Sequence, residues 1–366
     1  MDFTPTEEQT AAQGLAAQIF GDLATHERLA AAGTGTDTEL WKELCAAGLT
    51  AAVEEIGLLG LVLLLEEQGR TTAQVPFAVT CAYGLLAIVE HGTDEQRERL
   101  LPPLRDGTAV ATGAFPARDG LRADGEGRLI GSVPYVPWLR DATLVLVADA
   151  DRMLWIVRTA DPGVVVTPVE TTAPWSAARL ALDRAPGERL GGPAGRTGTD
   201  TRASTSTGTN SATGTAAYGA VLAASHTAFA GLQAGVCAGS LARAVSHTTT
   251  REQFGRPLST NQGVLLRAAD AHMDTEAIRV TAYEAAWRHD KGLPYAAQAL
   301  TAAWWASEAG KRVVHAGQHL HGGTGADLDH PVHRHFLWGR QLDAYLGCGS
   351  EVLEELGQLL VKEGSQ

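Results

Sequence analysis

Apolar residues recur at helical spacing through the first hundred positions of the chain. Thr6, followed by two glutamates, is typical of a helix N-terminus. Leu15, Ile19 and Leu23 then follow at intervals of four, which predicts one buried helix face. The apolar run that begins at Ile56 is shorter than the ~20 residues that span a membrane, so we expect a buried helix there. The same reasoning predicts helices over 38–46, 54–69, 76–90 and 93–101.

The pattern changes between residues 109 and 190. Short runs rich in β-branched and aromatic residues alternate there with Gly, Pro and Asp, which is typical of strands and turns. The runs are VATGAF, RLIGSVPYV, ATLVLVADA, RMLWIVRTA, GVVVTPVE and ARLALDR. We therefore expect a helical N-terminal domain over 1–107 and a small antiparallel β domain over 108–190.

Residues 191–215 contain almost no apolar side chain and repeat Thr, Gly and Ser. Such a stretch cannot bury enough surface to offset the entropy of ordering it, and it predicts a flexible linker. A lining role at a subunit surface is the alternative. The linker separates the β domain from a second helical region.

Long helical patterns after the linker predict a four-helix bundle over 216–366. They cover 216–249, 259–291, 294–320 and 331–345, with a shorter one over 350–362. Gly231, Gly235 and Gly239 recur every fourth residue on the first pattern, and each costs about 1 kcal/mol relative to Ala in a helix. We expect a neighbouring helix to approach their backbone closely. The predicted fold class is α+β, mostly α.

Charge and composition exclude several classes of function. The net charge is −13 and no basic run is present, so nucleic acid and anionic membranes are unfavourable partners. The first residues lack the positive charge and apolar block of a signal peptide, which predicts a cytoplasmic protein. Cys45, Cys81, Cys237 and Cys348 form no CxxC pair and are interpreted as small core residues rather than disulfides or zinc ligands.

Four segments carry a family resemblance that covers nearly the whole chain apart from the linker. They are MDFTPTEEQ at 1–9, EEQGR at 66–70, TREQFGRPLSTNQ at 250–262 and LHGGTGADLDHPVHRHF at 320–336. In combination they closely resemble the acyl-CoA dehydrogenase family, and the chain looks like a divergent, actinobacterial-type member. The resemblance implies that family's three-domain fold and an FAD-dependent oxidoreductase that acts on the CH–CH bond of an acyl thioester.

The resemblance implies that Arg251, Phe254 and Gln262 contact FAD. An Arg beside a glycine turn suits a pyrophosphate, because its guanidinium presents paired donors and keeps its charge. The residues alone also allow another interpretation, in which Arg251 caps a helix end, Phe254 is core, and Ser259 with Gln262 forms a capping box. The HGG segment favours flavin contact.

The loop after His319 carries consecutive glycines, Gly322 and Gly323, whose backbone can approach a ligand closely. By resemblance it lies against the FAD of a neighbouring subunit, with one FAD between the RxxFG turn of one chain and the HGG loop of another. The family commonly has Gln where this chain has His319. The alternative is an ordinary helix end, with histidines at the negative end of the helix dipole.

Histidines and aspartates between residues 319 and 335 do not predict a metal site. His333 and His335 are two positions apart and fall on opposite flanks of a helix. No HExxH motif or compact ligand set accompanies them. FAD is the one cofactor that we expect.

The catalytic base of the family is missing from both of its usual positions. Dehydrogenation of an acyl thioester needs a carboxylate for the α-proton while the flavin accepts the β-hydride. In the family this Glu comes from a YEGT-like turn, where this chain has Leu346, or from a helix position, where it has Ser225. The adjacent His226 is a weak candidate for a base near neutral pH.

The β domain departs from the family as well. A TEPxxGSD-like stretch, which meets the flavin ring in the family, reads GAFPARDG at 113–120. Tyr135 and Trp138 fall near the usual flavin-stacking region, but an aromatic packing pair in a β domain is an equal alternative.

These departures leave three hypotheses about function. In the first, the chain is a subunit of a flavoprotein acyl thioester dehydrogenase, in a homo-oligomer or with a related subunit that supplies the base. In the second, the same fold uses His226 for another oxidation, a dehydration or a cyclisation. In the third, the chain is a non-catalytic scaffold subunit. The acyl group, and whether coenzyme A or an acyl carrier protein carries it, stay open.

Overall fold

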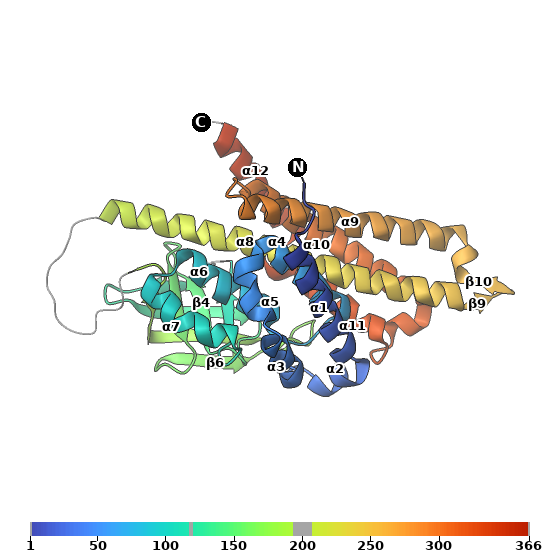
Figure 1. Ribbon diagram of the computed structural model, residues 1–366, viewed down its shortest axis with the longest axis horizontal. Coiled ribbons are helices and arrows are strands. Elements are labelled where there is room, and N and C mark those ends of the chain that lie inside the picture. The colour runs from blue at the N-terminus through green and yellow to red at the C-terminus, as the bar shows by residue number, and fades with distance from the viewer. Residues whose placement is uncertain (1, 117–119, 193–206, 365–366) are drawn as a thin grey trace.

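The computed structural model describes residues 2–116, 120–192 and 207–364, which form N-terminal helices, two small sheets and a C-terminal bundle (Figure 1). The N-terminal helices are α1 (Glu7–Leu23), α2 (His26–Ala32), α3 (Thr38–Ala46), α4 (Leu49–Thr71), α5 (Phe77–Val79), η1 (Thr80–Leu86), α6 (Ala87–His91) and α7 (Asp94–Arg105). The predicted start of α1 is confirmed. The Thr6 hydroxyl accepts a hydrogen bond from the Gln9 backbone N–H, and the Gln9 side chain accepts one from the Thr6 N–H.

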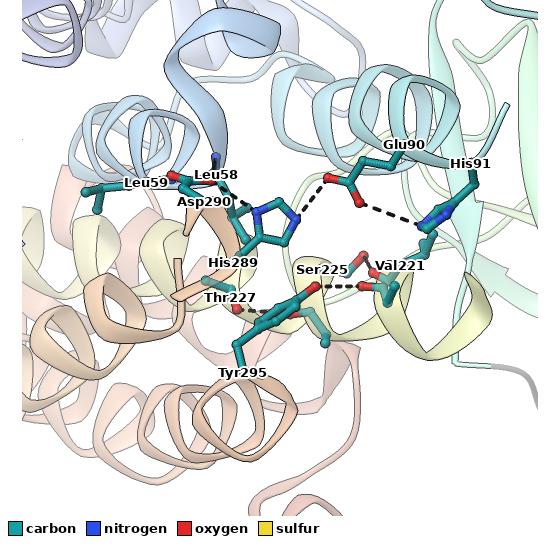
Figure 2. Close-up of polar contacts among 12 residues, drawn as sticks. Leu58, Leu59, Glu90, His91, Val221, Ser225, Thr227, His289, Asp290 and Tyr295 are labelled. Atoms are coloured by element: carbon teal, nitrogen blue, oxygen red, sulfur yellow. Dashed lines mark hydrogen bonds and ion pairs between the residues drawn. The ribbon is translucent and has the colours of Figure 1, made fainter. Parts of the chain in front are cut away.

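Two of the predicted N-terminal helices are less regular than the sequence suggested. α4 breaks at Gly57, whose φ of 70° and ψ of −167° lie outside the helical region. The carboxylate of Asp290 accepts hydrogen bonds from the N–H groups of Leu58 and Leu59 at 2.8 and 2.9 Å, so it caps the helix that restarts there (Figure 2). The predicted 76–90 helix contains the π-helical segment η1. Neither feature follows from local apolar spacing.

The β domain holds two four-stranded sheets. The strand order of the first sheet is β1 (Ala111–Ala114), β4 (Leu144–Ala148), β5 (Leu154–Arg158), β8 (Glu188–Arg189). The strand order of the second sheet is β2 (Leu121–Ala123), β3 (Arg128–Val136), β7 (Ala178–Pro186), β6 (Val164–Pro168). All six predicted strands are present, and neighbours pair antiparallel except for β1 with β4, which are parallel. Fully buried Leu129, Val145, Val157 and Leu180 belong to one apolar cluster drawn from both sheets.

The C-terminal bundle projects away from the sheets (Figure 1). Its helices are α8 (Thr207–Thr250), α9 (Gln262–Asp290), α10 (Ala296–Leu320) and α11 (Pro331–Tyr345), followed by α12 (Gly349–Gly364). A hairpin of β9 (Glu252–Gln253) and β10 (Arg256–Pro257) and the short helix η2 (Leu258–Thr260) join α8 to α9, and η3 (Gly322–Ala326) follows α10. α8 begins before the expected boundary at residue 216, and positions 193–206 of the predicted linker lie outside the described residues.

The glycines at every fourth position of α8 face α4, as predicted. A Cβ on any of them would overlap that helix: Gly231 meets Val62, Gly235 meets the backbone of Glu66, and Gly239 meets the carbonyl oxygen of Arg70. The two backbones therefore approach too closely for side chains to lie between them. This contact offsets the helix-weakening effect of glycine.

Part of α8, Thr215–Thr250, is the one unbent helix of the described residues with the length and apolar composition of a membrane span. However, 89% of its most apolar window is buried inside the fold. Burial of that kind is typical of the central helix of a bundle, because it packs on neighbours around its circumference.

The cysteines are only partly core residues. Cys81 and Cys237 are buried, as predicted, and Cys45 is half-buried. The prediction is wrong for Cys348, which is exposed. It lies in the turn between α11 and α12, where its thiol is 3.2 Å from the Ser350 hydroxyl.

Candidate functional site

A groove of about 590 Å³ lies between α8, the start of α10 and α12. Leu346, in the turn after α11, and His226, on α8, line its buried floor, where His226 Nε2 is 3.3 Å from the Leu346 carbonyl oxygen. Ser225 is fully buried, and its hydroxyl donates to the Val221 carbonyl at 2.7 Å (Figure 2). The structure thus brings Leu346 and His226 together and turns the Ser225 hydroxyl back into its own helix.

The floor of this groove presents no carboxylate. Its acidic residues, Glu351, Glu354 and Glu355, all lie on exposed α12 positions at the rim. Burial lowers the pKa of His226 to about 4, against the opposing effect of its contact with Leu346. A base with such low proton affinity is poorly matched to proton abstraction at neutral pH. The lowered pKa weakens the second hypothesis, in which His226 replaces the missing Glu.

Aromatic rings fill the region where the resemblance places a flavin. Trp138 is fully buried, with ring centroids 4.7 Å from Trp175 and 6.0 Å from Trp338. Tyr135 packs edge-on against Tyr345 at 6.2 Å, and Tyr345 also meets Trp175 at 6.2 Å. Tyr135 and Trp138 therefore belong to a wider aromatic network, made of Tyr135, Trp138, Trp175, Trp338 and Tyr345.

A second aromatic stack lies at the end of β1. Phe115 stacks on Tyr83 at 5.1 Å and on Tyr218 at 5.6 Å, and the Tyr83 hydroxyl lies 2.9 Å from the Tyr345 hydroxyl. Phe115 belongs to the segment whose family counterpart meets the flavin ring. In this chain the Phe115 ring instead packs against the rings of Tyr83 and Tyr218.

Among the described residues, the aromatic network leaves no place for a flavin ring beside Trp138. The neighbours of Trp138 already cover it, so a second ring system cannot stack there in this arrangement. Its indole N–H, like those of Trp175 and Trp338, is buried without a hydrogen-bond partner among the described residues. This chain's own side of the family's flavin site therefore does not fit FAD. Trp175 and Trp338 escaped sequence reasoning, because no motif links tryptophans so far apart along the chain.

The residues predicted to contact FAD lie elsewhere, on the surface. They are Arg251, Phe254, Gln262, His319, Gly322 and Gly323, all exposed. Phe254 is 102% exposed at the tip of the β9–β10 hairpin, which excludes the alternative that it is a core residue. α9 begins at Gln262, with Asn261 as its N-cap and no side-chain cap bond, so Ser259 and Gln262 do not form the alternative capping box.

Both predicted constellations lie at one end of the bundle. His247, whose carbonyl accepts a hydrogen bond from the Arg251 N–H at 2.9 Å, stacks on His321 with ring centroids 4.7 Å apart. The RxxFG hairpin and the HGG loop are therefore neighbours within one chain, at the right in Figure 1. The expectation that one FAD lies between the RxxFG turn of one chain and the HGG loop of another concerns contacts between chains and stays a prediction.

This end of the bundle is free to meet another molecule. Arg251 makes no side-chain hydrogen bond or ion pair with any residue that the structure describes. Gly322, at φ 62°, and Gly323 each have open space where a Cβ would be. An unpaired guanidinium beside an unobstructed backbone loop has the chemistry to hold a diphosphate that lies largely on another chain.

An ion-pair network joins α6 to the C-terminal end of α9, around half-buried His289 (Figure 2). Its Nε2 is 2.9 Å from Glu90, its Nδ1 is 3.1 Å from Asp290, and Glu90 also approaches His91 at 3.7 Å. Burial alone lowers the pKa of His289, but the two carboxylates outweigh it and raise the pKa to about 9. Across the described ranges, no three His, Cys, Asp or Glu side chains are grouped to hold a metal.

Known proteins match the chain over almost its full length. The family models described as acyl-CoA dehydrogenase, N-terminal domain, and acyl-CoA dehydrogenase, C-terminal domain, match residues 6–108 and 213–356. Acyl-CoA dehydrogenase FadE27 of Mycobacterium tuberculosis is 33% identical, with 99% of each chain covered. Acyl-CoA dehydrogenase FadE28 of the same organism is 28% identical, with 98% of each chain covered.

Two solved structures are similar to the whole chain. One, described as a variant of the Tcur3481-Tcur3483 steroid ACAD, is 40% identical with a TM-score of 0.88, over 98% of this chain and 99% of that one. The ChsE4-ChsE5 complex from Mycobacterium tuberculosis is 29% identical with a TM-score of 0.87, over 99% of each chain. Both descriptions name two different proteins together.

Proposed function

Because the chain belongs to the acyl-CoA dehydrogenase family, we propose that it is the non-catalytic subunit of a heteromeric, FAD-dependent acyl-CoA dehydrogenase. A related subunit supplies the flavin-ring site and the catalytic carboxylate. This chain supplies residues that contact the diphosphate side of that subunit's FAD. One observation carries the proposal: the ring side of this chain is filled by tryptophans, whereas its predicted diphosphate side is exposed and unpaired.

The missing base supports the assignment of the catalytic role to the partner. In the family's reaction, FAD accepts a hydride while a carboxylate accepts the α-proton. Leu346 occupies one usual position of that carboxylate, and Ser225 occupies the other with its hydroxyl bonded to its own helix. Without a base at either usual position, and with Trp138 covered by its neighbours, the described residues give this chain no separate use for a flavin of its own.

The exposed end of the bundle supports a contribution to the partner's cofactor. Arg251 would bind the diphosphate, Phe254 would pack on the cofactor from the hairpin tip, and Gln262 would lie behind them at the start of α9. On the loop side, His319 would stand in for the family's Gln, and the backbone of Gly322 and Gly323 would approach the cofactor.

An exposed apolar strip on α9 supports the presence of a partner. Leu265, Leu266, Met273 and Val280 are each between 51% and 65% exposed, and they recur along one helix of the bundle. Large apolar side chains gathered on one face indicate a protein contact, because their exposure to water is unfavourable. The strip begins close to the predicted cofactor edge, so one interface would cover both.

The descriptions of the similar structures suggest which class of substrate the heteromer acts on. The 40% identical one is described as a steroid ACAD, and it pairs two proteins. We therefore propose that the heteromer dehydrogenates an acyl-CoA whose acyl group is attached to a polycyclic, steroid-like body.

Co-purification tests this proposal. The chain should be expressed alone and together with a related dehydrogenase subunit, encoded nearby, that has Glu in its YEGT turn. We expect the chain alone to be colourless and inactive, and the pair to form a stable heteromer with one FAD for every two chains and dehydrogenase activity. A flavin-loaded chain that oxidises acyl-CoA without a partner would overturn the proposal.

A further inference from the structure

We propose that the groove of this chain, which has no catalytic carboxylate, is a binding site for an uncharged, apolar molecule with one hydroxyl group, and that it excludes acyl-CoA. The inference concerns this chain alone and does not depend on the proposed partner. Three features of the groove carry it: its size and the apolar part of its lining, one buried hydrogen-bond acceptor in its floor, and the charge of its rim.

The groove has the dimensions and walls of a small-molecule site. Its volume of about 590 Å³ lies within the range of roughly 300–1,000 Å³ that is typical of such sites. Leu222 and Ala223 of α8, Leu300 of α10 and Leu359 of α12 contribute apolar wall, and Leu346 closes the floor. A ligand that covers this surface gains the hydrophobic free energy of burying it.

His226 gives the floor its one polar side chain. It is 3% exposed, and its Nε2 faces the Leu346 carbonyl at 3.3 Å. A carbonyl oxygen only accepts, so the neutral ring carries its proton on Nε2, and Nδ1 is left as an acceptor. Nδ1 has no hydrogen-bond partner among the described residues. A ligand hydroxyl satisfies it, because a hydroxyl can donate.

The charges around the groove select against anions. Glu351, Glu354 and Glu355 line it, and the basic groups that face them are Arg152 and Lys362. Arg152 lies over the Tyr218 ring at 5.4 Å and also interacts electrostatically with Glu355, so three carboxylates share two basic groups. The acidic excess repels the phosphates of coenzyme A and the carboxylate of a fatty acid. The neutral imidazole of His226 supplies no compensating positive charge, because burial holds its pKa near 4.

Gly219 offers a way to block the groove without disturbing the fold. It lines the groove, and a Cβ at this helix position meets nothing within 4 Å. Gly219→Trp therefore places an indole in the ligand space. Gly14 on α1 is an exposed helix glycine with equally open surroundings, so Gly14→Trp is a matched control.

The test is titration of the full-length chain with a fluorescent sterol that carries one hydroxyl group, dehydroergosterol. We expect saturable binding that weakens at least about tenfold in Gly219→Trp, is unchanged in Gly14→Trp, and resists competition by octanoyl-CoA. In His226→Phe, which keeps the apolar floor, we expect the preference for the sterol over its deoxy hydrocarbon to disappear.

Three results would overturn the inference: no saturable binding, equal binding by Gly219→Trp, or displacement of the sterol by octanoyl-CoA. A His226→Phe variant that keeps its preference for the hydroxyl would overturn the assigned role of that side chain. Each result is separable from the proposed function, because heteromer formation and flavin content are measured without the sterol.

Discussion

Leu346 shows how one side chain sets what the groove can do. Its side chain is 9% exposed, and its carbonyl faces neutral His226. A carboxylate at this position would lie in an apolar floor beside a histidine that does not become charged, so its ionised form would be disfavoured. Leu346→Glu therefore restores the family's carboxylate but not the surroundings that would keep it ionised.

We expect Leu346→Glu in the isolated chain to remain inactive with straight-chain acyl-CoA and to unfold at lower denaturant concentration than the wild-type protein. A positioned base contributes typically ~10²- to 10⁴-fold in rate, but it acts only beside a bound flavin. Reduction of an artificial electron acceptor measures activity, and Leu346→Gln is the neutral control. Turnover in Leu346→Glu but not in Leu346→Gln would show that this chain can hold its own flavin.

Arg251 is the residue whose removal we expect to affect the cofactor of the heteromer. Arg251→Ala removes a charge-assisted contact to a diphosphate of roughly 1.5 to 3 kcal/mol, so FAD affinity should fall by about ten- to hundredfold. Flavin absorbance after dialysis measures occupancy. Arg122→Ala, at an exposed position in the β domain, is the control and should retain FAD. Unchanged occupancy with lower thermal stability would instead make Arg251 a helix-end residue.

At the scale of elements, apolar periodicity predicted most helices and all six of the expected strands, because each is decided by neighbours in sequence. The break at Gly57 depends on Asp290, which arrives from another domain, so no local pattern could predict it. The motifs located the exposed end of the bundle. The filled ring site depends on Trp175 and Trp338, whose contact with Trp138 exists only after folding.

The glycine contact between α4 and α8 makes an unusual prediction about Gly→Ala substitutions. Alanine at an exposed helix glycine normally stabilises by up to about 1 kcal/mol, and we expect this for Gly14→Ala. Gly235→Ala should instead destabilise by at least ~1–3 kcal/mol, because its methyl group overlaps the backbone of Glu66. Urea unfolding of both variants measures the difference. Stabilisation by Gly235→Ala would mean that the two helices can separate without loss.

For the whole molecule, we expect stability to be greatest near pH 6.5. Burial lowers the pKa values of His226 and His335 to about 4, and the charge of Arg243 adds to the effect at His335. Their contribution is present above the ordinary value of 6.5 and is lost as pH falls toward 4. His289 behaves oppositely: its contribution is present below 6.5 and is lost as pH rises through about 9.

Urea unfolding at intervals from about pH 5 to about pH 9 measures both arms of this profile. His289→Gln should flatten the alkaline arm and leave the acid arm in place, because it removes the one group of the three whose pKa is raised. If the stability of His289→Gln still falls at alkaline pH, a group other than His289 causes that fall.

The aromatic network also gives the molecule an optical marker. Trp138 comes from the β domain and Trp338 from α11, and with Trp175 their ring centroids lie 4.7 to 6.0 Å apart, shielded from water. Indoles held rigidly in a packed interior give near-ultraviolet circular dichroism, so this cluster should contribute a near-ultraviolet signal. Its loss would report separation of the β domain from the bundle, without any attached label.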